Sequence, residues 1–405
     1  MTQSSKDPIL VAGGGIGGLA AAIALAQDGH NVQIVEQAPE FCAIGFGIQL
    51  GPNVFPMLDR LGVGDPVRHA AFHPSAIAML DALDGQTLVN IPAGSSLKRR
   101  FGNPYVVIIR SDLHQILVER CAQLPNITMH TNFLVTGIER SDDAVTLTSS
   151  SGERLDGSAL IGADGLKSLA RSTLRQEGEP NFTGYVAHRT MVPTKELPPA
   201  LYRDDVVLWA GPGFHIVHYP LRGASLFNIV AVFQTPSFNA QLSPSQLRDE
   251  LIATYAEAHP HMRQLIGLVD FEKRWSLSDR SPTRDWTSGN LALLGDAAHP
   301  TLQSIAQGAC MAIEDAVTLA DAIAVHDNFP TAFAAYNRAR YLRTARVQLV
   351  SRHMWEVYHE TGIAREVRNA QYREQTVEQS YDCLQWLWGG KDQTETRAQA
   401  QRRRA

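Results

Sequence analysis

Cysteines, signal-like segments and long hydrophobic runs are scarce in this chain. Its four cysteines include no CxxC pair and no histidine spacing suited to zinc, so no metal site is expected and a reducing cytoplasm fits best. We expect these cysteines to be small buried side chains. Residues 1–8 lack the basic and then apolar order of a signal peptide, and the apolar stretch 19–26 is too short to span a bilayer.

An excess of positive charge is also lacking. The formal net charge is −5 and the isoelectric point is about 6.3, so nothing attracts polyanions and nucleic acid is not expected as a partner. Hydrophobic residues make up 44% and charged residues 19% of the 405 residues, which is typical of folded proteins. A chain of this length can form two or three layers around a large core.

The first 36 residues predict a strand, a helix and a second strand. The continuous apolar run 8–12 is typical of a strand that is covered on both faces in a parallel sheet. Residues 18–27 are rich in Ala and Leu and predict the helix, and residues 31–36 predict the next strand. This is a βαβ unit of the usual length.

The middle of the chain has a different pattern. Aromatic and β-branched runs between residues 183 and 234 predict a mostly antiparallel sheet with Gly and Pro turns. Two further apolar runs, 159–161 and 291–294, return to the pattern of a buried parallel strand. After Gly308 the sequence predicts helix to about residue 375, and the polar tail 391–405 is interpreted as a solvated end.

A glycine-rich loop follows the first predicted strand. It contains a GxGxxG pattern in which Gly13 allows the tight turn, Gly15 lets a pyrophosphate approach the backbone and Gly18 lets helix and strand pack closely. Gly17 belongs to the same loop, and the helix that follows offers free N–H groups to phosphates. Glu36 ends the second strand, where its carboxylate can accept hydrogen bonds from ribose hydroxyls. The pattern predicts a dinucleotide site without separating FAD from NAD.

Two later strands also end in an acid beside a glycine. Asp164 and Gly165 follow the run 159–161, and Asp296 follows Gly295 after the run 291–294. Carboxylates at the carboxyl ends of parallel strands lie on the ligand side of such a sheet. Each acid taken singly could instead be a turn or helix cap.

With these three signals in this order, the chain resembles the class A flavoprotein monooxygenases, the family of para-hydroxybenzoate hydroxylase and salicylate hydroxylase. The resemblance implies that the glycine loop and Glu36 hold the ADP half of FAD, and that Asp296 binds its ribityl chain. It also implies that Asp164 serves both FAD and the nicotinamide, and that Arg110 reaches the FAD phosphates.

Two further segments are included in this resemblance. The loop around Gly47 and Ile48 is similar to the mobile loop beside the isoalloxazine ring in that family. The helix that begins near Gly308 and Ala309 would direct its positive end at the pyrimidine edge of the flavin. The fold implied is α/β, with a Rossmann-like FAD-binding domain and parallel sheet interleaved with a mostly antiparallel-sheet substrate domain, followed by C-terminal helices.

The expected domain division follows from these patterns. Residues 1–182 would form the FAD-binding domain, with a substrate-side insertion at about 72–108. Residues 183–283 would form the substrate domain, 284–345 would return to the FAD-binding domain, and 346–405 would form a C-terminal helical region and tail.

The segment 299–309 departs from the pattern of many family members and looks like the 3-hydroxybenzoate 6-hydroxylase branch, as do the segments 214–221 and 386–389. In that branch the substrate pocket is lined by residues that match His215, Tyr219 and Gln303. The resemblance implies that NADH reduces the flavin, that O2 adds as a C4a-hydroperoxide, and that its distal oxygen attacks the ring. A phenolate is the better ring nucleophile, so a base helps, and a histidine can accept the phenolic proton near neutral pH.

His215 is the candidate base, and Tyr219 and Gln303 could orient the substrate. Alternatives stay open at this point. His215 and Tyr219, four residues apart on one strand face, could be an ordinary half-buried pair, and Gln303 could cap backbone in a loop. His218 should face the other side of the sheet, and His299 is interpreted as a packing or hydrogen-bonding residue.

The function predicted is an NADH-dependent flavoprotein monooxygenase that converts a small aromatic acid, with 3-hydroxybenzoate to gentisate (2,5-dihydroxybenzoate) favoured. Salicylate or a hydroxynicotinate is the alternative substrate. A flavin reductase without oxygen insertion and a non-enzymatic flavin-binding module are the rival classes. The NADH preference and a homodimer are expected from the family branch.

Overall fold

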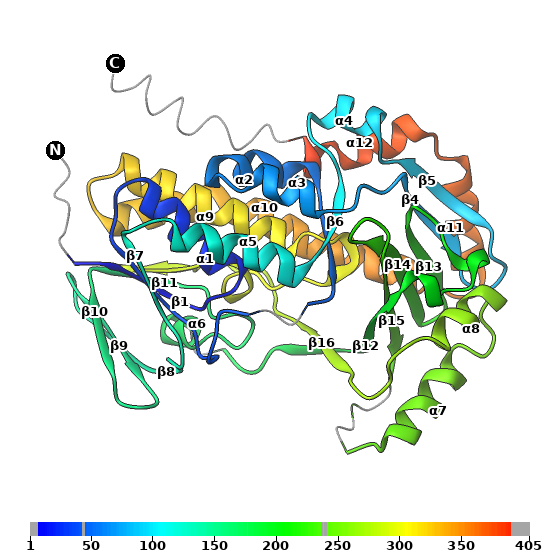
Figure 1. The fold of residues 1–405 in the computed structure, drawn as a ribbon, viewed down its shortest axis with the longest axis horizontal. Coiled ribbons are helices and arrows are strands. Elements are labelled where there is room, and N and C mark those ends of the chain that lie inside the picture. Colours follow the sequence, from blue (N-terminus) through cyan, green and yellow to red (C-terminus); the bar gives the residue numbers. More distant parts are fainter. Residues whose placement is uncertain (1–6, 43–44, 176, 236–237, 239–240, 390–405) are drawn as a thin grey trace.

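The structure is a computed structural model that describes residues 7–42, 45–175, 177–235, 238 and 241–389. The predicted solvated tail 391–405 lies outside the described residues. Figure 1 shows an elongated molecule with one sheet at the end near the N-terminus and a second sheet at the opposite end. Long helices run between these two ends.

The first sheet contains the predicted βαβ unit. In the described chain it has the order β17-β18-β11-β1-β2-β7, and β18, β11, β1, β2 and β7 are parallel. Its strands are β1 (Ile9–Ala12), β2 (Val32–Val35), β7 (Ile127–His130), β11 (Ala159–Gly162), β17 (Thr287–Ser288) and β18 (Leu291–Leu293). All four residues of β1 are buried, as expected of a strand covered on both faces. The predicted return of the chain to this sheet at β11 and β18 is confirmed.

The second sheet provides one wall of the cavity described below. Its order is β16-β12-β15-β14-β13-β4-β5 within the described residues, and its pairs are antiparallel except β13 with β4. The strands are β4 (Ala76–Asp81), β5 (Thr87–Pro92), β12 (Asn181–Pro193), β13 (Val206–Gly211), β14 (Phe214–Leu221), β15 (Leu226–Gln234) and β16 (Trp275–Asp279). β4 and β5 come from within the expected insertion at 72–108; the domain boundaries themselves stay a prediction.

Helices α7 (Pro244–Thr254) and α8 (Pro260–Ile266) cover one face of this second sheet, where Leu251, Tyr255 and Met262 pack against its apolar side chains. The opposite face looks toward the first sheet. Two smaller sheets complete the strands: β3 (Gly47–Leu50) with β6 (Val106–Ile109), and β8 (Val135–Arg140) with β9 (Val145–Ser149) and β10 (Arg154–Gly157).

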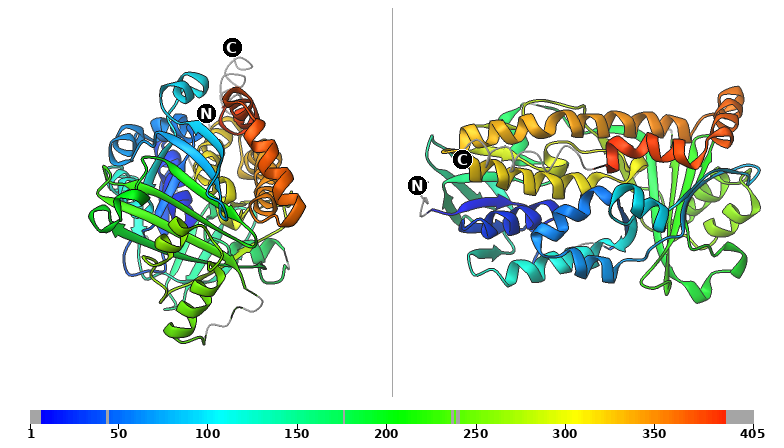
Figure 2. Two further views of the ribbon diagram at one scale, coloured as in Figure 1. Left: turned by 90° about the vertical axis from the view of Figure 1, so that its right-hand side faces the viewer. Right: turned by 90° about the horizontal axis from the view of Figure 1, so that it is seen from above.

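The long helices connect the two sheets. α9 (Gly308–Val325) packs against α1 (Ile16–Gln27) and against α10 (Phe329–Tyr358), and the three lie along the long axis of the molecule (Figure 2). The remaining helices are α2 (Phe55–Leu61), α3 (Gly64–Ala70), α4 (Ser95–Phe101), α5 (Arg110–Ala122), α6 (Leu169–Leu174), α11 (Gly362–Glu374) and α12 (Val377–Trp388). No helix in the described ranges is long and apolar enough to cross a membrane.

Two expectations were wrong in detail. The helical region does not stop near residue 375: α11 ends at Glu374, but Thr376 and Gln379 form a capping box that starts the additional helix α12. The cysteines are not all buried: the four thiols are free, and Cys121 and Cys310 are buried, but Cys42 and Cys383 are exposed. The burial of a cysteine depends on which distant segments pack over it, and the residue type alone does not show this.

Candidate active site

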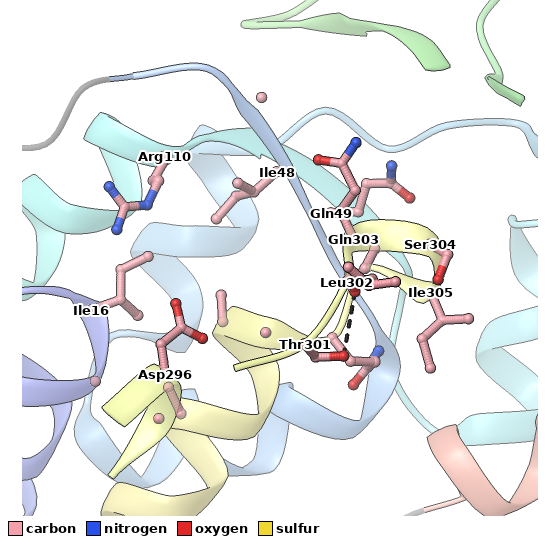
Figure 3. A pocket seen from close by; sticks show the side chains of 18 of the residues that line it. Ile16, Ile48, Gln49, Arg110, Asp296, Thr301, Leu302, Gln303, Ser304 and Ile305 are labelled. Atoms are coloured by element: carbon pink, nitrogen blue, oxygen red, sulfur yellow. Dashed lines mark hydrogen bonds between the residues drawn. The ribbon is translucent and has the colours of Figure 1, made fainter. Parts of the chain in front are cut away.

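A cavity of about 1160 Å³ lies between the two sheets. At one end it is lined by the loops that follow β1, β11 and β18, and at the other by the inner face of the second sheet. Figure 3 shows Ile16, Arg110 and Asp296 toward one side of this cavity and Gln49 and Gln303 toward the other. All the site residues predicted from the sequence line it except Gly18.

The glycine loop after β1 allows close contacts that a side chain would prevent. Gly13 has φ +110°, and a Cβ there would lie 2.4 Å from the Ala163 carbonyl oxygen. A Cβ on Gly18 would lie 1.9 Å from the Gly13 oxygen, so Gly18 serves the turn and lies behind the cavity wall. At Gly15 no atom lies within 4 Å of the Cβ position, so this face of the loop is open. An open row of backbone amides before a helix suits a pyrophosphate.

Glu36 is held by the backbone around it. One carboxylate oxygen accepts a hydrogen bond from the Gly14 amide at 2.9 Å, and the other accepts from the Ala38 amide at 3.0 Å. The side chain lines the cavity, and each oxygen has a further lone pair to offer. Its position suits ribose hydroxyls next to the glycine loop.

Asp296 and Arg110 bring opposite charges into the cavity (Figure 3). Protein surrounds the Asp296 carboxyl, and burial raises its pKa, yet its side chain stays accessible from the cavity. No described residue hydrogen-bonds to the Asp296 carboxylate, and none forms an ion pair with Arg110. A carboxylate and a guanidinium without partners fit the hydroxyls and the phosphates of FAD respectively.

Asp164 supports a helix cap, the alternative considered for it, although the cap residue of α6 itself is Ser168. Its carboxylate accepts hydrogen bonds from the Ser168 hydroxyl at 2.5 Å and from the Ala170 amide at 3.1 Å, at the start of α6. Burial nevertheless raises its pKa. Asp164 and Gly165 also line the cavity, so they contribute its wall as well as the cap.

The loop at Gly47 reaches the second sheet. The Gly47 amide donates to Asn228 Oδ1 at 3.0 Å, and a Cβ on Gly47 would lie 2.6 Å from the Tyr219 ring. Only glycine fits at residue 47, because any side chain there would collide with the Tyr219 ring. The next residue, Ile48, lines the cavity. At the far side, Gly308 and Ala309 begin α9 with its N-terminus at the cavity.

His215 and Tyr219 lie on one face of β14 and line the cavity, with Val217 between them. His218 faces the other side, as predicted, and accepts a hydrogen bond from the Trp209 indole N–H at 3.0 Å. Both His215 and Tyr219 are buried within the fold. The strand therefore brings an imidazole and a phenol to the same cavity wall.

The His215 ring is paired with a second imidazole that the sequence did not indicate. His215 Nδ1 lies 2.8 Å from His359 Nε2, and the two rings stack with centroids 5.0 Å apart. Burial, and next the neighbouring His359, lowers the pKa of His215 well below its ordinary value. The prediction that His215 titrates near neutral pH is therefore not supported, because burial removes this ring from water and lowers its pKa. Burial also lowers the pKa of His359 to about 3.

Two more polar pairs at the cavity were missed. Arg189 Nη2 donates to Gln303 Oε1 at 2.7 Å, and the Tyr105 hydroxyl donates to Gln49 Oε1. Arg189 left a faint signal, because it is the one Arg, Lys, Asp or Glu in β12. Tyr105 and His359 left none, because each lies far in sequence from the residues it meets.

His299 has the structural role that was predicted. Its Nε2 lies 2.5 Å from Asp315 Oδ2, and Arg340 bonds the other Asp315 oxygen at 2.7 Å. Asp315 also accepts from the Gly295 amide at 3.1 Å. This carboxylate therefore connects the Gly295–Asp296 turn to α9 and α10.

Comparison with known proteins agrees with this geometry. A family model described as an FAD binding domain matches residues 6–351. The 3-hydroxybenzoate 6-hydroxylase of Polaromonas naphthalenivorans (strain CJ2) is 44% identical over 391 residues, covering 96% of this chain and 98% of that protein. The 3-hydroxybenzoate 6-hydroxylase of Klebsiella oxytoca is 40% identical over 384 residues, with 95% and 96% covered.

Solved structures give the same result. Klebsiella pneumoniae HpxO complexed with FAD and uric acid superimposes with a TM-score of 0.85 at 27% identity, over 95% of this chain and 98% of that one. A salicylate hydroxylase substrate complex superimposes with a TM-score of 0.80 at 25% identity, over 97% and 98%. The chain therefore belongs to the FAD-binding family of flavoprotein aromatic hydroxylases and is an FAD-dependent monooxygenase.

Proposed function

We propose that this enzyme uses NADH and O2 to hydroxylate 3-hydroxybenzoate para to its hydroxyl group, forming gentisate (2,5-dihydroxybenzoate). The observation that carries the proposal is that one continuous cavity joins the nucleotide-binding loops to a sheet face that presents His215 and Tyr219. The relatives named 3-hydroxybenzoate 6-hydroxylase support the choice of substrate. No described helix could cross a membrane, and a cytoplasmic location stays a prediction.

The cavity residues divide between the cofactor and the substrate. Glu36 and the glycine loop would hold the ADP half of FAD, Arg110 its phosphates and Asp296 its ribityl hydroxyls. The N-terminus of α9 at Gly308 would face the pyrimidine edge of the flavin. FAD, when bound and reduced by NADH, would activate O2 so that one of its oxygen atoms can be transferred to the ring.

The reaction balances with these reactants. One aromatic C–H becomes C–OH with one atom of O2, and the other oxygen atom leaves as water. The two electrons that this requires come from the hydride of NADH, and one further proton is consumed from solvent. The protein must therefore keep the ring oriented, exclude water from the cavity and accept the phenolic proton.

His215 is the residue proposed to accept that proton. Both imidazoles of the His215–His359 pair are neutral near neutral pH, because burial lowers the pKa of each. A hydrogen bond between two neutral rings contains one proton. In the tautomer with the proton on His215 Nδ1, donation to His359 Nε2 leaves the lone pair on His215 Nε2 free to accept from a phenol. His359 thus acts through His215 as a positioning residue.

Tyr219 and Gln303 are proposed to orient the ring. Tyr219 lies two residues from Val217 on the same strand face as His215, and its hydroxyl is near the Gln49 side chain. Because the Gln303 carbonyl oxygen is occupied by Arg189, its amide N–H groups are what it can offer to a substrate oxygen. A donor on each side of the ring would determine which carbon faces the flavin.

The test is an oxygen-uptake and stopped-flow panel of monohydroxylated benzoates and 6-hydroxynicotinate, with products separated by chromatography. Gentisate from 3-hydroxybenzoate, formed in step with NADH consumption, is the expected result. Conversion of salicylate or 6-hydroxynicotinate instead would replace the proposed substrate; a 6-hydroxynicotinate 3-monooxygenase of Pseudomonas fluorescens is 34% identical over 358 residues. NADH oxidation that yields no hydroxylated product would indicate a non-oxygenating flavin reductase.

A homodimer is part of the same proposal. Several large apolar side chains of α10 and α11 are exposed in the chain by itself: Leu342, Leu349, Ile363 and Val367. Exposed apolar surface of this kind supports self-association. Sedimentation of the FAD-loaded protein should give twice the chain mass, and a monomer across micromolar concentrations would contradict it.

A further inference from the structure

The sheet face at the cavity carries a single permanent charge among the described residues. Arg189 of β12 pairs with Val230 of β15, and Val230 pairs with Val217 of β14. All three side chains line the cavity, and Leu208 and Met79 continue the same row across the sheet. The row is therefore apolar apart from the guanidinium near one edge.

The protein accepts hydrogen bonds from only some of the N–H groups of the Arg189 guanidinium. Nη2 donates to the neutral Gln303 amide, while Nε is buried without a hydrogen-bond partner. The groups that act on its charge are Tyr219 and Arg110, and no carboxylate is among them. Burial lowers the pKa of Arg189, but an arginine stays protonated at neutral pH. A buried cation without a counter-ion is costly, so an anion should bind there when the site is filled.

We propose that Arg189 binds the carboxylate of the aromatic acid and thereby directs the hydroxyl-bearing end of the ring toward His215 and Tyr219. This assignment rests on the function proposed above and specifies which residue selects for an acid.

The register of the sheet supports this placement. Val217 lies between His215 and Tyr219 on β14, and β12 is two strands away, so about 10 Å separates the backbones of Arg189 and Val217. The three polar side chains rise from the same face. A ring lying over Val230 would therefore have its carboxylate at the guanidinium and its hydroxyl at the imidazole. The planar guanidinium suits a carboxylate, with which it can form two parallel hydrogen bonds.

Gln303 has a defined part in this arrangement. Its carbonyl oxygen holds one nitrogen of Arg189, which limits the orientations of the guanidinium and leaves Nε open. A ligand of the same shape without a negative charge would leave that cation unpaired. The site should therefore discriminate between an acid and its neutral isostere by charge rather than by size.

The experiment measures dissociation constants from the perturbation of flavin absorbance in the FAD-loaded enzyme. The probes are 3-hydroxybenzoate and its neutral isostere 3-hydroxybenzamide. Arg189→Gln should weaken binding of the benzoate on the order of 100-fold and of the benzamide by about threefold or less. Arg189→Lys, which keeps the charge, should recover part of the benzoate affinity. The exposed Arg99 gives a charge-matched control, Arg99→Gln, which should bind both ligands as the wild type does.

Each other outcome has a distinct meaning. Equal losses for both ligands would overturn the proposal, since they indicate that Arg189 supports the fold or the flavin. Unchanged benzoate affinity in Arg189→Gln would also overturn it. If Arg189→Gln does not retain FAD, the test is the ratio of the two dissociation constants in the wild-type enzyme. The proposal requires that the wild type bind the benzoate at least about tenfold more tightly than the benzamide. Hydroxylation of 3-hydroxybenzoate without that preference refutes only this assignment, whereas absence of binding and of hydroxylation refutes the proposed function as well.

Discussion

Replacing Asp315 by Asn tests how the Gly295–Asp296 turn at the cavity is held in place. The carboxylate accepts hydrogen bonds from the Gly295 amide, from His299 and from Arg340, and it is fully buried. Asn has the same shape but no charge, and its amide nitrogen must face one of these donors. Among the described residues, Glu314 would then be the one carboxylate left to pair with Arg340, beside its weaker contacts to Met311.

The expected loss of stability follows from this loss of charge. Breaking a buried ion pair by removing one partner costs about 3–5 kcal/mol, and an isosteric Asn that keeps one acceptor belongs at the lower end, about 3 kcal/mol. In a chain of this size that corresponds to roughly 3–4 °C in the midpoint of thermal unfolding. FAD should also bind more weakly, because the Gly295–Asp296 turn loses one of its attachments to α9.

Acid should reduce the difference between the two proteins. Although burial raises the pKa of Asp315, His299 and Arg340 outweigh it and hold the pKa at about 2, below the ordinary value of 3.8. A carboxyl group whose pKa is lower in the folded state stabilises the fold at any pH above its unfolded-state pKa. That stabilisation is lost as the pH falls toward the folded-state pKa. The contribution is therefore complete at neutral pH and declines below about pH 4.

The assay is thermal unfolding of the FAD-loaded proteins by circular dichroism from pH 7 to pH 3, with FAD affinity measured by fluorescence. Asp327→Asn, an exposed acid just beyond the end of α9, is the matched control and should match the wild type. A midpoint of Asp315→Asn within about 1 °C of the wild type at pH 7 would refute this account of the cluster. So would a deficit that stays constant down to pH 3.

Four further substitutions test the cavity. Asp296→Ala should weaken FAD binding about 10- to 100-fold by removing an acceptor for the ribityl hydroxyls, as measured by FAD titration of the apoprotein; unaltered affinity would exclude that contact. His215→Ala should retain FAD yet slow hydroxylation by on the order of 100-fold, and His359→Phe should also slow it. Wild-type rates of hydroxylation in a single turnover would exclude His215 as the base. Tyr219→Phe should lose about 1 kcal/mol of positioning and divert NADH consumption toward hydrogen peroxide, so wild-type coupling would contradict its role.

The sequence by itself determined the nucleotide end of the cavity. Gly13 and Gly15 follow a strand and precede a helix. At Gly13 the positive φ and the close Ala163 carbonyl oxygen require glycine, and at Gly15 the absence of a side chain keeps the loop open to a phosphate. The alternation of a strand likewise placed His215 and Tyr219 on one face and His218 on the other. Such features depend on neighbours a few residues away, so the pattern along the chain contains them.

Only the tertiary structure decided which side chains meet at the substrate end. His359 reaches His215 across 144 residues, and Arg189 reaches Gln303 across 114, because α10 and the loop before α9 pack onto the second sheet. The same packing removes His215 from water and so lowers its pKa, which its residue type could not show. Long-range packing determines contacts and desolvation, whereas local sequence determines backbone turns and the faces of strands.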